Sequence, residues 1–219
     1  MKKMFILCVS FLFCFAFVSI TVTHADTVLL NDDFNSENGG IGWAGDYTGF
    51  ANWTVTAGYV DLAGYGSWDF LGTGEPYGVY VDMDGGQYTA GALTSNQSFN
   101  LISGTVLLQF DLAGSHRGDY EYYKANVVRV IFGSFSEDFT LNSDDPFTTY
   151  SRYITITTPI SAHLTFQSVA ALDPWGHYGD NIGALLDNVK LTAAVPEPAT
   201  MLLLGLGLMG LAGVRRFKN

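Results

Sequence analysis

The stretch Thr105-Val-Leu-Leu-Gln-Phe-Asp-Leu112 decides the fold class, because apolar side chains alternate with other residues along it. Val106, Leu108, Phe110 and Leu112 share one face of an extended chain, since successive side chains of a strand point to opposite faces. Similar segments recur between turn residues. We expect further strands at 28–34, 126–135, 150–157, 162–169 and 184–191, and a hairpin formed by 53–55 and 59–62.

About nine or ten short strands with turn punctuation are typical of an antiparallel β-sandwich. We therefore predict an all-β domain over residues 26–194, of the jelly-roll type, flanked by two segments of different character. No internal repeat indicates a solenoid or a propeller.

The N-terminal segment, residues 1–25, reads as a secretory signal peptide. Lys2 and Lys3 form a basic start, residues 4–20 are apolar, and His24 separates the small residues at positions 23 and 25. This pattern predicts cleavage after Ala25. The alternative is an uncleaved anchor, for which the apolar run is long enough.

The C-terminal segment, residues 195–219, combines three parts in a fixed order. Pro196-Glu197-Pro198 comes first, residues 199–214 carry no charge, and Arg215 and Arg216 follow. An uncharged stretch with a basic stop predicts a transmembrane helix over 199–214. The alternative is a simple membrane anchor preceded by a chance Pro-Glu-Pro.

This three-part end resembles the PEP-CTERM sorting signal of Gram-negative bacteria. The resemblance implies recognition by an exosortase, a membrane cysteine transpeptidase that cuts near Pro196, Glu197 and Pro198, with Arg215 and Arg216 as the basic end of the signal. It also implies export, an intermediate anchored in the inner membrane, and a final place at the cell surface or in the extracellular matrix. Proteins with this signal are typically associated with exopolysaccharide and biofilm production.

The charge distribution excludes several classes of function. Residues 26–195 hold 20 of the 21 carboxylates and five of the ten Lys and Arg residues, so this part carries a net charge of −15. Nucleic-acid binding is therefore not expected, because phosphate neutralisation needs clustered cations. Both cysteines, Cys8 and Cys14, lie in the N-terminal segment that is predicted to be a signal peptide. The domain thus has no disulfide, no thiolate metal site and no cysteine nucleophile.

The middle of the chain also resembles a galactose-binding-like jelly roll, the fold that carbohydrate-binding modules use. The first and last strands carry this resemblance, at Asn31-Asp-Asp-Phe34 and Asp187-Asn-Val-Lys-Leu191. The whole middle also resembles a recurrent domain of PEP-CTERM proteins. The phrases that carry this second resemblance are Tyr80-Val-Asp-Met-Asp-Gly85, Phe110-Asp-Leu-Ala-Gly114, Phe139-Thr-Leu141, Asp145-Pro-Phe-Thr148, Asp180-Asn-Ile-Gly183 and Leu186-Asp-Asn-Val189. The resemblance supports the fold and implies a carbohydrate ligand.

Two aspartates are predicted on the core face of the first and last strands. Strand parity places Asp32 beside Leu30, and Asp187 beside Val189. Two buried carboxylates repel each other unless a cation lies between them. We therefore predict a structural Ca²⁺ between Asp32 and Asp187, with Asp33 or Asn35 as further oxygen ligands; the resemblance also implies a structural calcium near this place. The alternatives are a bulge that redirects one aspartate, or pairing of Asp187 with Arg, Tyr or backbone amides.

Flat aromatic rings and polar side chains in loops are the parts from which sugar sites are made. Our carbohydrate-binding candidates are Trp68, Arg117, Tyr120, Trp175 and Tyr178, because a jelly roll binds ligands at its loops or on one sheet face. The alternative for each ring is core packing. Asp82 and Asp84 are interpreted as a strand end with a turn, because they lack the later ligands of a calcium-binding loop.

Enzymatic chemistry has little support in the sequence. There is no His-Glu-x-x-His helix, no Gly-x-Ser-x-Gly elbow and no phosphate-binding loop. A glycosidase needs only two carboxylates, and nothing singles out such a pair. We expect a non-enzymatic surface or matrix protein that binds extracellular polysaccharide. The alternatives are a structural matrix protein without a ligand pocket and a polysaccharide-processing enzyme.

Overall fold

A computed structural model describes residues 24–64, 69–71, 78–86, 89–117, 126–169, 182–196, 205 and 207. Two compact units divide the chain. One unit comprises Asp26–Ala194, and the other comprises Met1–Ala25 with Val195–Asn219. The first unit is the β domain described below.

Thirteen strands and one short 3₁₀-helix make up the described elements. They are β1 (His24–Asp32), η1 (Glu37–Gly40), β2 (Trp53–Ala57), β3 (Asp61–Gly64), β4 (Val79–Asp82), β5 (Ala92–Ser95), β6 (Phe99–Leu101), β7 (Gly104–Ala113), β8 (Asn126–Phe132), β9 (Phe135–Leu141), β10 (Thr148–Ile156), β11 (Ile160–Ala162), β12 (Leu164–Ser168) and β13 (Leu185–Pro196).

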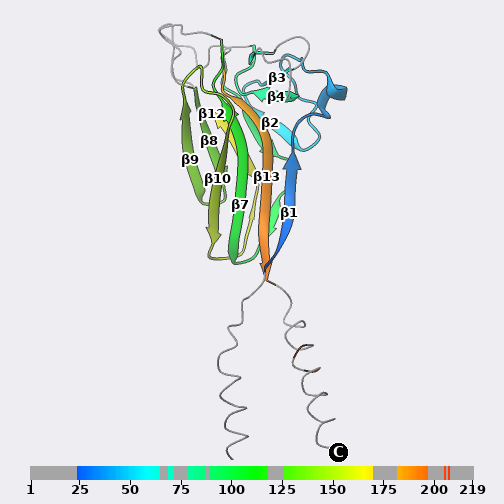
Figure 1. Cartoon of the computed structure of the whole chain (residues 1–219), viewed down its shortest axis with the longest axis vertical. Coiled ribbons are helices and arrows are strands. Elements are labelled where there is room, and N and C mark those ends of the chain that lie inside the picture. Colours follow the sequence, from blue (N-terminus) through cyan, green and yellow to red (C-terminus); the bar gives the residue numbers. More distant parts are fainter. Residues whose placement is uncertain are drawn as a thin grey trace, which may run out of the picture. The chain divides into compact units, whose positions relative to one another are not determined.

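Two antiparallel sheets form the sandwich, which confirms the predicted all-β class. The six-stranded sheet has the order β10-β7-β13-β4-β3, with β1 paired to β13, and the five-stranded sheet has the order β2-β5-β12-β8-β9. Strands β6 and β11 form a separate pair. Figure 1 shows β10, β7, β13 and β1 side by side, with β1 beginning and β13 ending at the same end of the domain.

The core lies between the two sheets and follows the predicted alternation. Val106, Leu108, Phe110 and Leu112 of β7 are all buried in it. The ring of Phe110 packs edge-on against Phe139 of β9, with the ring centroids 5.1 Å apart. Because Phe139 belongs to the opposite sheet, this contact joins the two layers directly.

The predicted hairpin of 53–55 and 59–62 is wrong. Strand β2 pairs with β5 in the five-stranded sheet, whereas β3 pairs with β4 in the six-stranded sheet. The chain crosses between the layers at Gly58, which has φ +53° and whose added Cβ would lie 2.0 Å from the carbonyl oxygen of Ala90. Only glycine fits such a close approach at positive φ without strain.

Two strand ends also differ from the expected bounds. The segment predicted at 126–135 ends at Phe132, where a two-residue turn leads into β9. The first strand ends at Asp32, and Phe34 adopts a left-handed conformation with φ +53°.

No helix among the described residues is long and apolar enough to cross a membrane. Of the predicted helix at 199–214, only Gly205 and Gly207 are described, and both are helical.

Candidate functional site

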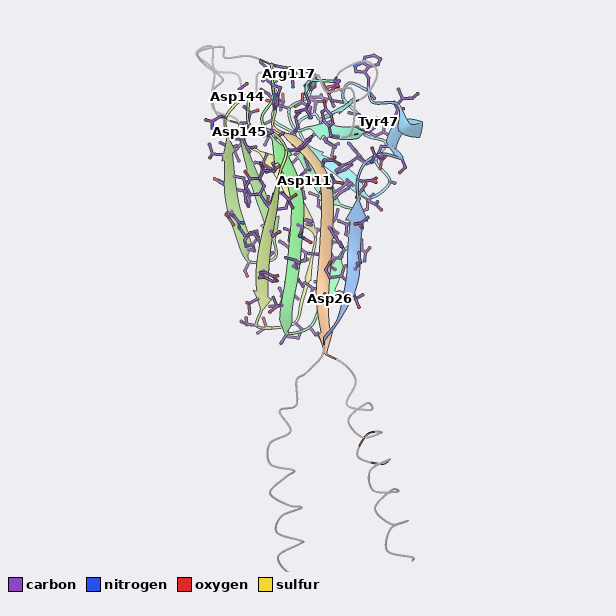
Figure 2. All side chains as sticks on the ribbon, in the orientation of Figure 1. Asp26, Tyr47, Asp111, Arg117, Asp144 and Asp145 are labelled. Atoms are coloured by element: carbon purple, nitrogen blue, oxygen red, sulfur yellow. The ribbon has the colours of Figure 1, made fainter. Side chains whose placement is uncertain are left out.

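The outer face of the six-stranded sheet, which is the face turned away from the core, carries an ordered array of polar side chains. Strand register sets three rows across β10, β7 and β13. The rows are Thr149–Asp111–Asp187, Ser151–Gln109–Lys190 and Tyr153–Leu107–Thr192. Two residues along a strand separate neighbouring rows, which corresponds to about 6.6 Å. Figure 2 shows Asp111 along the length of β7 and Arg117 at the loop end of the domain.

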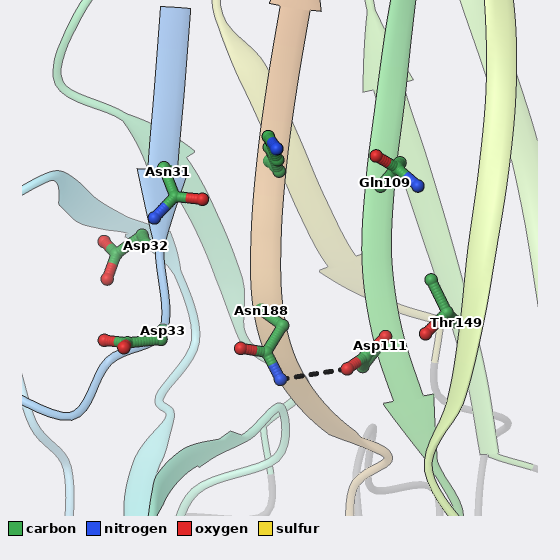
Figure 3. Close-up of a pocket in the computed structure, with 8 residues that line it drawn as sticks. Asn31, Asp32, Asp33, Gln109, Asp111, Thr149 and Asn188 are labelled. Atoms are coloured by element: carbon green, nitrogen blue, oxygen red, sulfur yellow. Dashed lines mark hydrogen bonds between the residues drawn. The ribbon is translucent and has the colours of Figure 1, made fainter. Parts of the chain in front are cut away.

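A polar hollow lies on this face and is called the outer-face hollow. Its volume is about 290 Å³. Eight residues line it, and every one has a side chain that can form hydrogen bonds: Asn31, Asp32, Asp33, Gln109, Asp111, Thr149, Asn188 and Lys190. Figure 3 shows that they come from β1, β13, β7 and β10 and from the segment after β1.

A β-bulge in β13 shapes the hollow. The register shifts between Asp187 and Lys190, so that two residues stand opposite Phe110. Asn188 takes the left-handed conformation, with φ +51°, which asparagine tolerates better than most residues. Its exposed side chain donates from Nδ2 to Oδ2 of Asp111 over 2.9 Å.

Because of this bulge, the core face predicted for Asp187 is wrong. Leu186 and Val189 face the core, whereas Asp187 pairs in register with Asp111 on the outer face. The predicted burial is correct, because Asp187 is only 2% exposed, but it lies on the other side of the sheet. One extra residue in a strand reverses the face of every later side chain.

Asp187 is a buried carboxyl with few donors. Its Oδ1 accepts a hydrogen bond from the backbone N–H of Asn188 at 2.7 Å, and its Oδ2 accepts one from the Asn188 side chain at 3.2 Å. Its pKa is raised to about 8, chiefly by burial and in addition by the negative charges of Asp111, Asp33 and Asp32, while the hydrogen bond from the backbone N–H of Asn188 opposes the rise. The negative charges of three aspartates thus act on a carboxyl that burial already favours in its protonated form.

Asp32 keeps the predicted core-side position and is satisfied by neutral donors. Its Oδ1 accepts the backbone N–H of Phe34 at 2.9 Å. Its Oδ2 accepts the indole N–H of Trp53 at 2.8 Å and the side-chain amide of Asn52 at 3.0 Å. Because Trp53 belongs to the five-stranded sheet, this carboxylate links the two layers.

The residues predicted to hold calcium do not form one shared site. Asp32 and Asp187 lie on opposite faces of the same sheet, Oδ1 of Asp33 accepts the backbone N–H of Asn35 at 3.1 Å, and Oδ1 of Asn35 accepts the backbone N–H of Val79 at 2.8 Å. In the described part of the chain, no three His, Cys, Asp or Glu side chains are grouped to hold a metal ion. Calcium binding stays a prediction.

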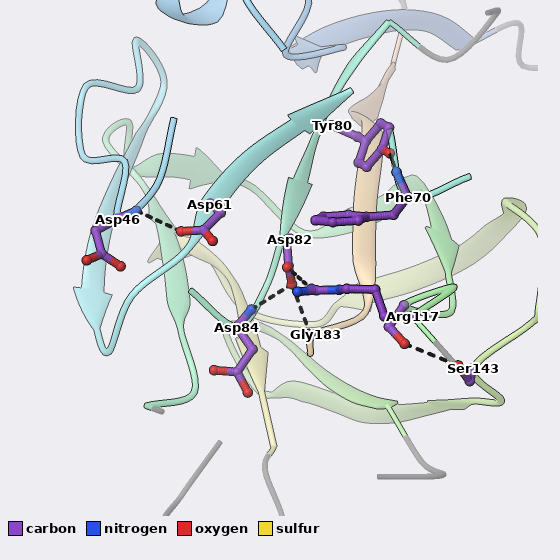
Figure 4. Close-up of polar contacts among 10 residues, drawn as sticks. Asp46, Asp61, Phe70, Tyr80, Asp82, Asp84, Arg117, Ser143 and Gly183 are labelled. Carbon is purple, nitrogen blue, oxygen red and sulfur yellow. Dashed lines mark hydrogen bonds and ion pairs between the residues drawn. The ribbon is translucent and has the colours of Figure 1, made fainter. Parts of the chain in front are cut away.

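A second polar group, called the Arg117 cluster, lies at the loop end (Figure 4). Arg117 forms an ion pair with Asp82, whose side chain is fully buried, and its guanidinium lies 4.1 Å from the ring centroid of Phe70. Asp61 and Asp84 are buried beside this pair. Burial raises the pKa of Asp82 to about 8, while the positive charge of Arg117 and the backbone N–H of Asp84 oppose that rise.

Sequence reasoning placed Arg117 among the sugar-binding residues and interpreted Asp82 and Asp84 as a turn. In the structure, the aspartates enter a buried electrostatic cluster, and the guanidinium that was proposed for a ligand is held by Asp82 and Phe70. Nothing in the local sequence relates positions 82 and 117, because they meet only through the fold.

The other predicted sugar-binding residues, Trp68, Tyr120, Trp175 and Tyr178, lie outside the described residues. Of the sorting residues, Pro196 is the last residue of β13, and Glu197, Pro198, Arg215 and Arg216 lie outside the described part. Tyr153 is not among the residues predicted from the sequence, although it lies on the outer face and is 77% exposed. Its alternation with Ile154 and Ile156 is the signal that identifies its outward direction.

Comparison with known proteins identifies the C-terminal segment. A model described as the PEP-CTERM protein-sorting motif matches residues 194–216, so the chain carries this sorting motif. No curated protein sequence matches the chain.

Several solved structures are similar to the domain at low identity. A variant of a family 29 carbohydrate-binding module has 16% identity and a TM-score of 0.39, with 80% of this chain and 89% of that chain covered. A carbohydrate-binding module from Cellvibrio mixtus lichenase 5A, in complex with cellotriose, has 10% identity and a TM-score of 0.35, with 75% of this chain and 97% of that chain covered. The enzymatically active domain of tailspike protein 4 of bacteriophage CBA120 has 11% identity and a TM-score of 0.42, with coverage of 68% and 20%. Because these TM-scores are low, no family or ligand is assigned from them.

Proposed function

We propose that the protein is an exported, surface-sorted, non-catalytic protein that binds carbohydrate on the outer face of its six-stranded sheet. The observation that carries this proposal is the outer-face hollow, in which all eight lining side chains can form hydrogen bonds. Sugar hydroxyls both donate and accept, and amides, carboxylates and hydroxyls provide the complementary groups.

An exposed aromatic ring on the same face supports the proposal. Tyr153 is four residues from Thr149 along β10, which places the two about 13 Å apart in an extended strand. Such a span suits an oligosaccharide rather than a single sugar. The ring offers an apolar face to the C–H side of a pyranose, and the hollow offers partners for its hydroxyls.

The PEP-CTERM motif supports the proposed route to the surface. An exosortase of a Gram-negative bacterium would process the chain near Pro196 after the C-terminal segment has held it at the inner membrane. The product would then lie at the cell surface or in an exopolysaccharide matrix. Deletion of the exosortase gene in the native host should leave the uncleaved chain in the membrane fraction, and normal processing in that strain would contradict this route.

A glycan array tests the binding proposal. The full chain, purified in lauryldimethylamine oxide to avoid sugar-based detergents, should bind at least one polysaccharide. A variant with Gln109→Ala and Thr149→Ala should bind it about tenfold more weakly, because each lost hydrogen bond contributes about 0.5–1.5 kcal/mol. Binding of no glycan by a folded protein would favour a structural matrix protein instead, and release of reducing ends from the glycan would favour an enzyme.

Calcium is a separate proposal and no part of the binding function depends on it. A cation bound only by the native state raises the melting temperature. Thermal melts of the full chain with 1 mM Ca²⁺ and with EDTA measure this effect, on the order of 1–3 kcal/mol for a site well saturated with ion. Identical melting temperatures in the two buffers would contradict the proposed calcium site.

A further inference from the structure

The outer-face hollow has a strongly acidic lining. Asp33 and Asp111 contribute two carboxylates, and Lys190 contributes the one cation among the lining residues. Asp32 also borders the hollow, but its carboxylate is turned to the core side, where it accepts hydrogen bonds from Trp53 and Asn52. A further carboxyl, Asp187, lies buried behind them, and the negative charges of Asp111, Asp33 and Asp32 add to the effect of burial in raising its pKa. The ligand therefore enters a region of negative potential.

The other basic side chains of the described residues are already paired. Arg117 pairs with Asp82, Arg129 with Asp138, and Arg152 with Glu137. Lys190 is thus the only Lys or Arg among the described residues that can meet a ligand anion in the hollow. One lysine does not balance the surrounding carboxylates, and the domain as a whole is acidic.

The neutral lining groups suit uncharged hydroxyls. Asn31, Gln109 and Asn188 carry amides that both donate and accept, and Thr149 carries a hydroxyl. Nε2 of Gln109 already lies 3.2 Å from Oγ of Ser151, which holds the amide in place on the sheet face. These groups do not supply the paired N–H forks with which proteins bind carboxylate or sulfate.

We propose that the outer-face hollow selects neutral glycans and excludes acidic ones, such as uronates and sulfated polysaccharides. This inference rests on the proposed carbohydrate binding and specifies its substrate class. Two like charges about 6 Å apart in water repel enough to lower affinity about threefold. The charges of Asp33 and Asp111, with that of Asp32 acting from the core side of the sheet, exceed the charge of Lys190 by two. This net charge gives about a tenfold preference for a neutral sugar over its uronate.

Matched glycans test the proposal. An array carries neutral glucans, mannans and galactans, each beside its C6-oxidised uronate form, which differs only in the carboxylate. The full chain is applied in lauryldimethylamine oxide at about 20 mM ionic strength, where screening between exposed charges is weak. The neutral member of the bound pair should bind about tenfold more tightly, and 0.5 M salt should reduce this preference.

One charge-removing variant locates the effect. Asp111→Asn should reduce the neutral-to-uronate affinity ratio about threefold, because it removes one charge from the hollow. Asp144→Asn is the matched control, since Asp144 is exposed at the loop end and lines no part of the hollow; its ratio should equal that of the wild type.

The outcomes separate the two proposals. Equal or tighter binding of the uronate form, or an equal change of the ratio in Asp144→Asn, would overturn the charge selection and leave carbohydrate binding intact. Binding of neither member of any pair by a folded protein would overturn the proposed function and the charge selection together.

Discussion

The outer-face hollow and the Arg117 cluster contain similar aspartates in different surroundings. Asp187 and Asp82 are both buried, and burial raises the pKa of each to about 8. Asp82 has Arg117 against it, with the Phe70 ring over the guanidinium. Among the described residues, Asp187 accepts hydrogen bonds only from Asn188, and it lies behind an open, polar surface. The comparison separates a carboxyl that is paired with a cation inside the fold from a carboxyl that has no cation beside it and lies under a surface.

The difference explains why the two regions have different expected roles. In the Arg117 cluster, the cation that a ligand would need is already bound to Asp82, which makes the pair part of the structure. In the outer-face hollow, the amide of Asn188 and the ammonium of Lys190 lie among the residues that line the open surface. Variants should therefore affect stability in the first region and binding in the second.

Removal of Arg117 should have the largest effect. Arg117→Met leaves Asp82 buried without its cation, and breaking a buried pair in this way costs about 3–5 kcal/mol. Urea unfolding of the full chain measures the loss. The double variant with Asp82→Asn is the control, and it should recover part of the loss because no uncompensated charge remains. A loss below about 0.5 kcal/mol in Arg117→Met would contradict a structural role of the pair, since changes of that size are typical of ordinary surface positions.

The second-largest effect should be a fall in stability with rising pH that is caused by the Asp187 carboxyl. Its folded-state pKa is raised to about 8, above the ordinary value, so the folded state holds a proton that the unfolded chain releases. This contribution is fully present below the unfolded pKa and is lost as the pH rises toward 8. Between pH 6 and pH 8, the free energy of unfolding should fall by about 2 kcal/mol more in the wild type than in Asp187→Asn.

Urea titrations at pH 6, 7 and 8 measure that difference, and Asp144→Asn serves as the surface control. Parallel pH profiles for the wild type and Asp187→Asn would show that Asp187 is not held protonated under the hollow.

Tyr153 should give the smallest effect, confined to binding. Tyr153→Ala removes an exposed ring from the outer face, and an aromatic contact is worth about 0.5–1.5 kcal/mol. Glycan affinity should fall about threefold to tenfold with an unchanged urea midpoint. Tyr59→Ala, which removes another exposed ring, is the control. Equal losses in both variants would show that binding does not depend on the outer face.

The sequence predicts the parts of the fold that depend on local alternation. Strand β7 follows directly from Val106, Leu108 and Phe110, and the burial of Asp32 follows from the same rule. The face of Asp187 does not follow, because Asn188 introduces a bulge that no periodicity reveals. A single left-handed residue is enough to reverse the parity of the last strand.

The candidate site was harder to predict, because it depends on contacts between distant segments. The hollow brings Asn31 of the first strand beside Asn188 of the last, as expected when terminal strands pair. Gln109 and Thr149 line the other side of the hollow, and they lie next to the last strand only because the strand order is β10-β7-β13. The ion pair of Arg117 with Asp82 likewise depends on the fold, and no spacing motif encodes it.

Chemical-shift mapping tests the central claim most directly. The nitrogen-15-labelled full chain in detergent is titrated with the glycan that binds most tightly on the array. We predict that the largest shifts fall on backbone amides of the outer-face hollow, around Asn31, Gln109, Asp111, Asn188 and Lys190. Shifts confined to the loop end around Phe70 and Arg117, with the hollow unchanged, would contradict the proposed site.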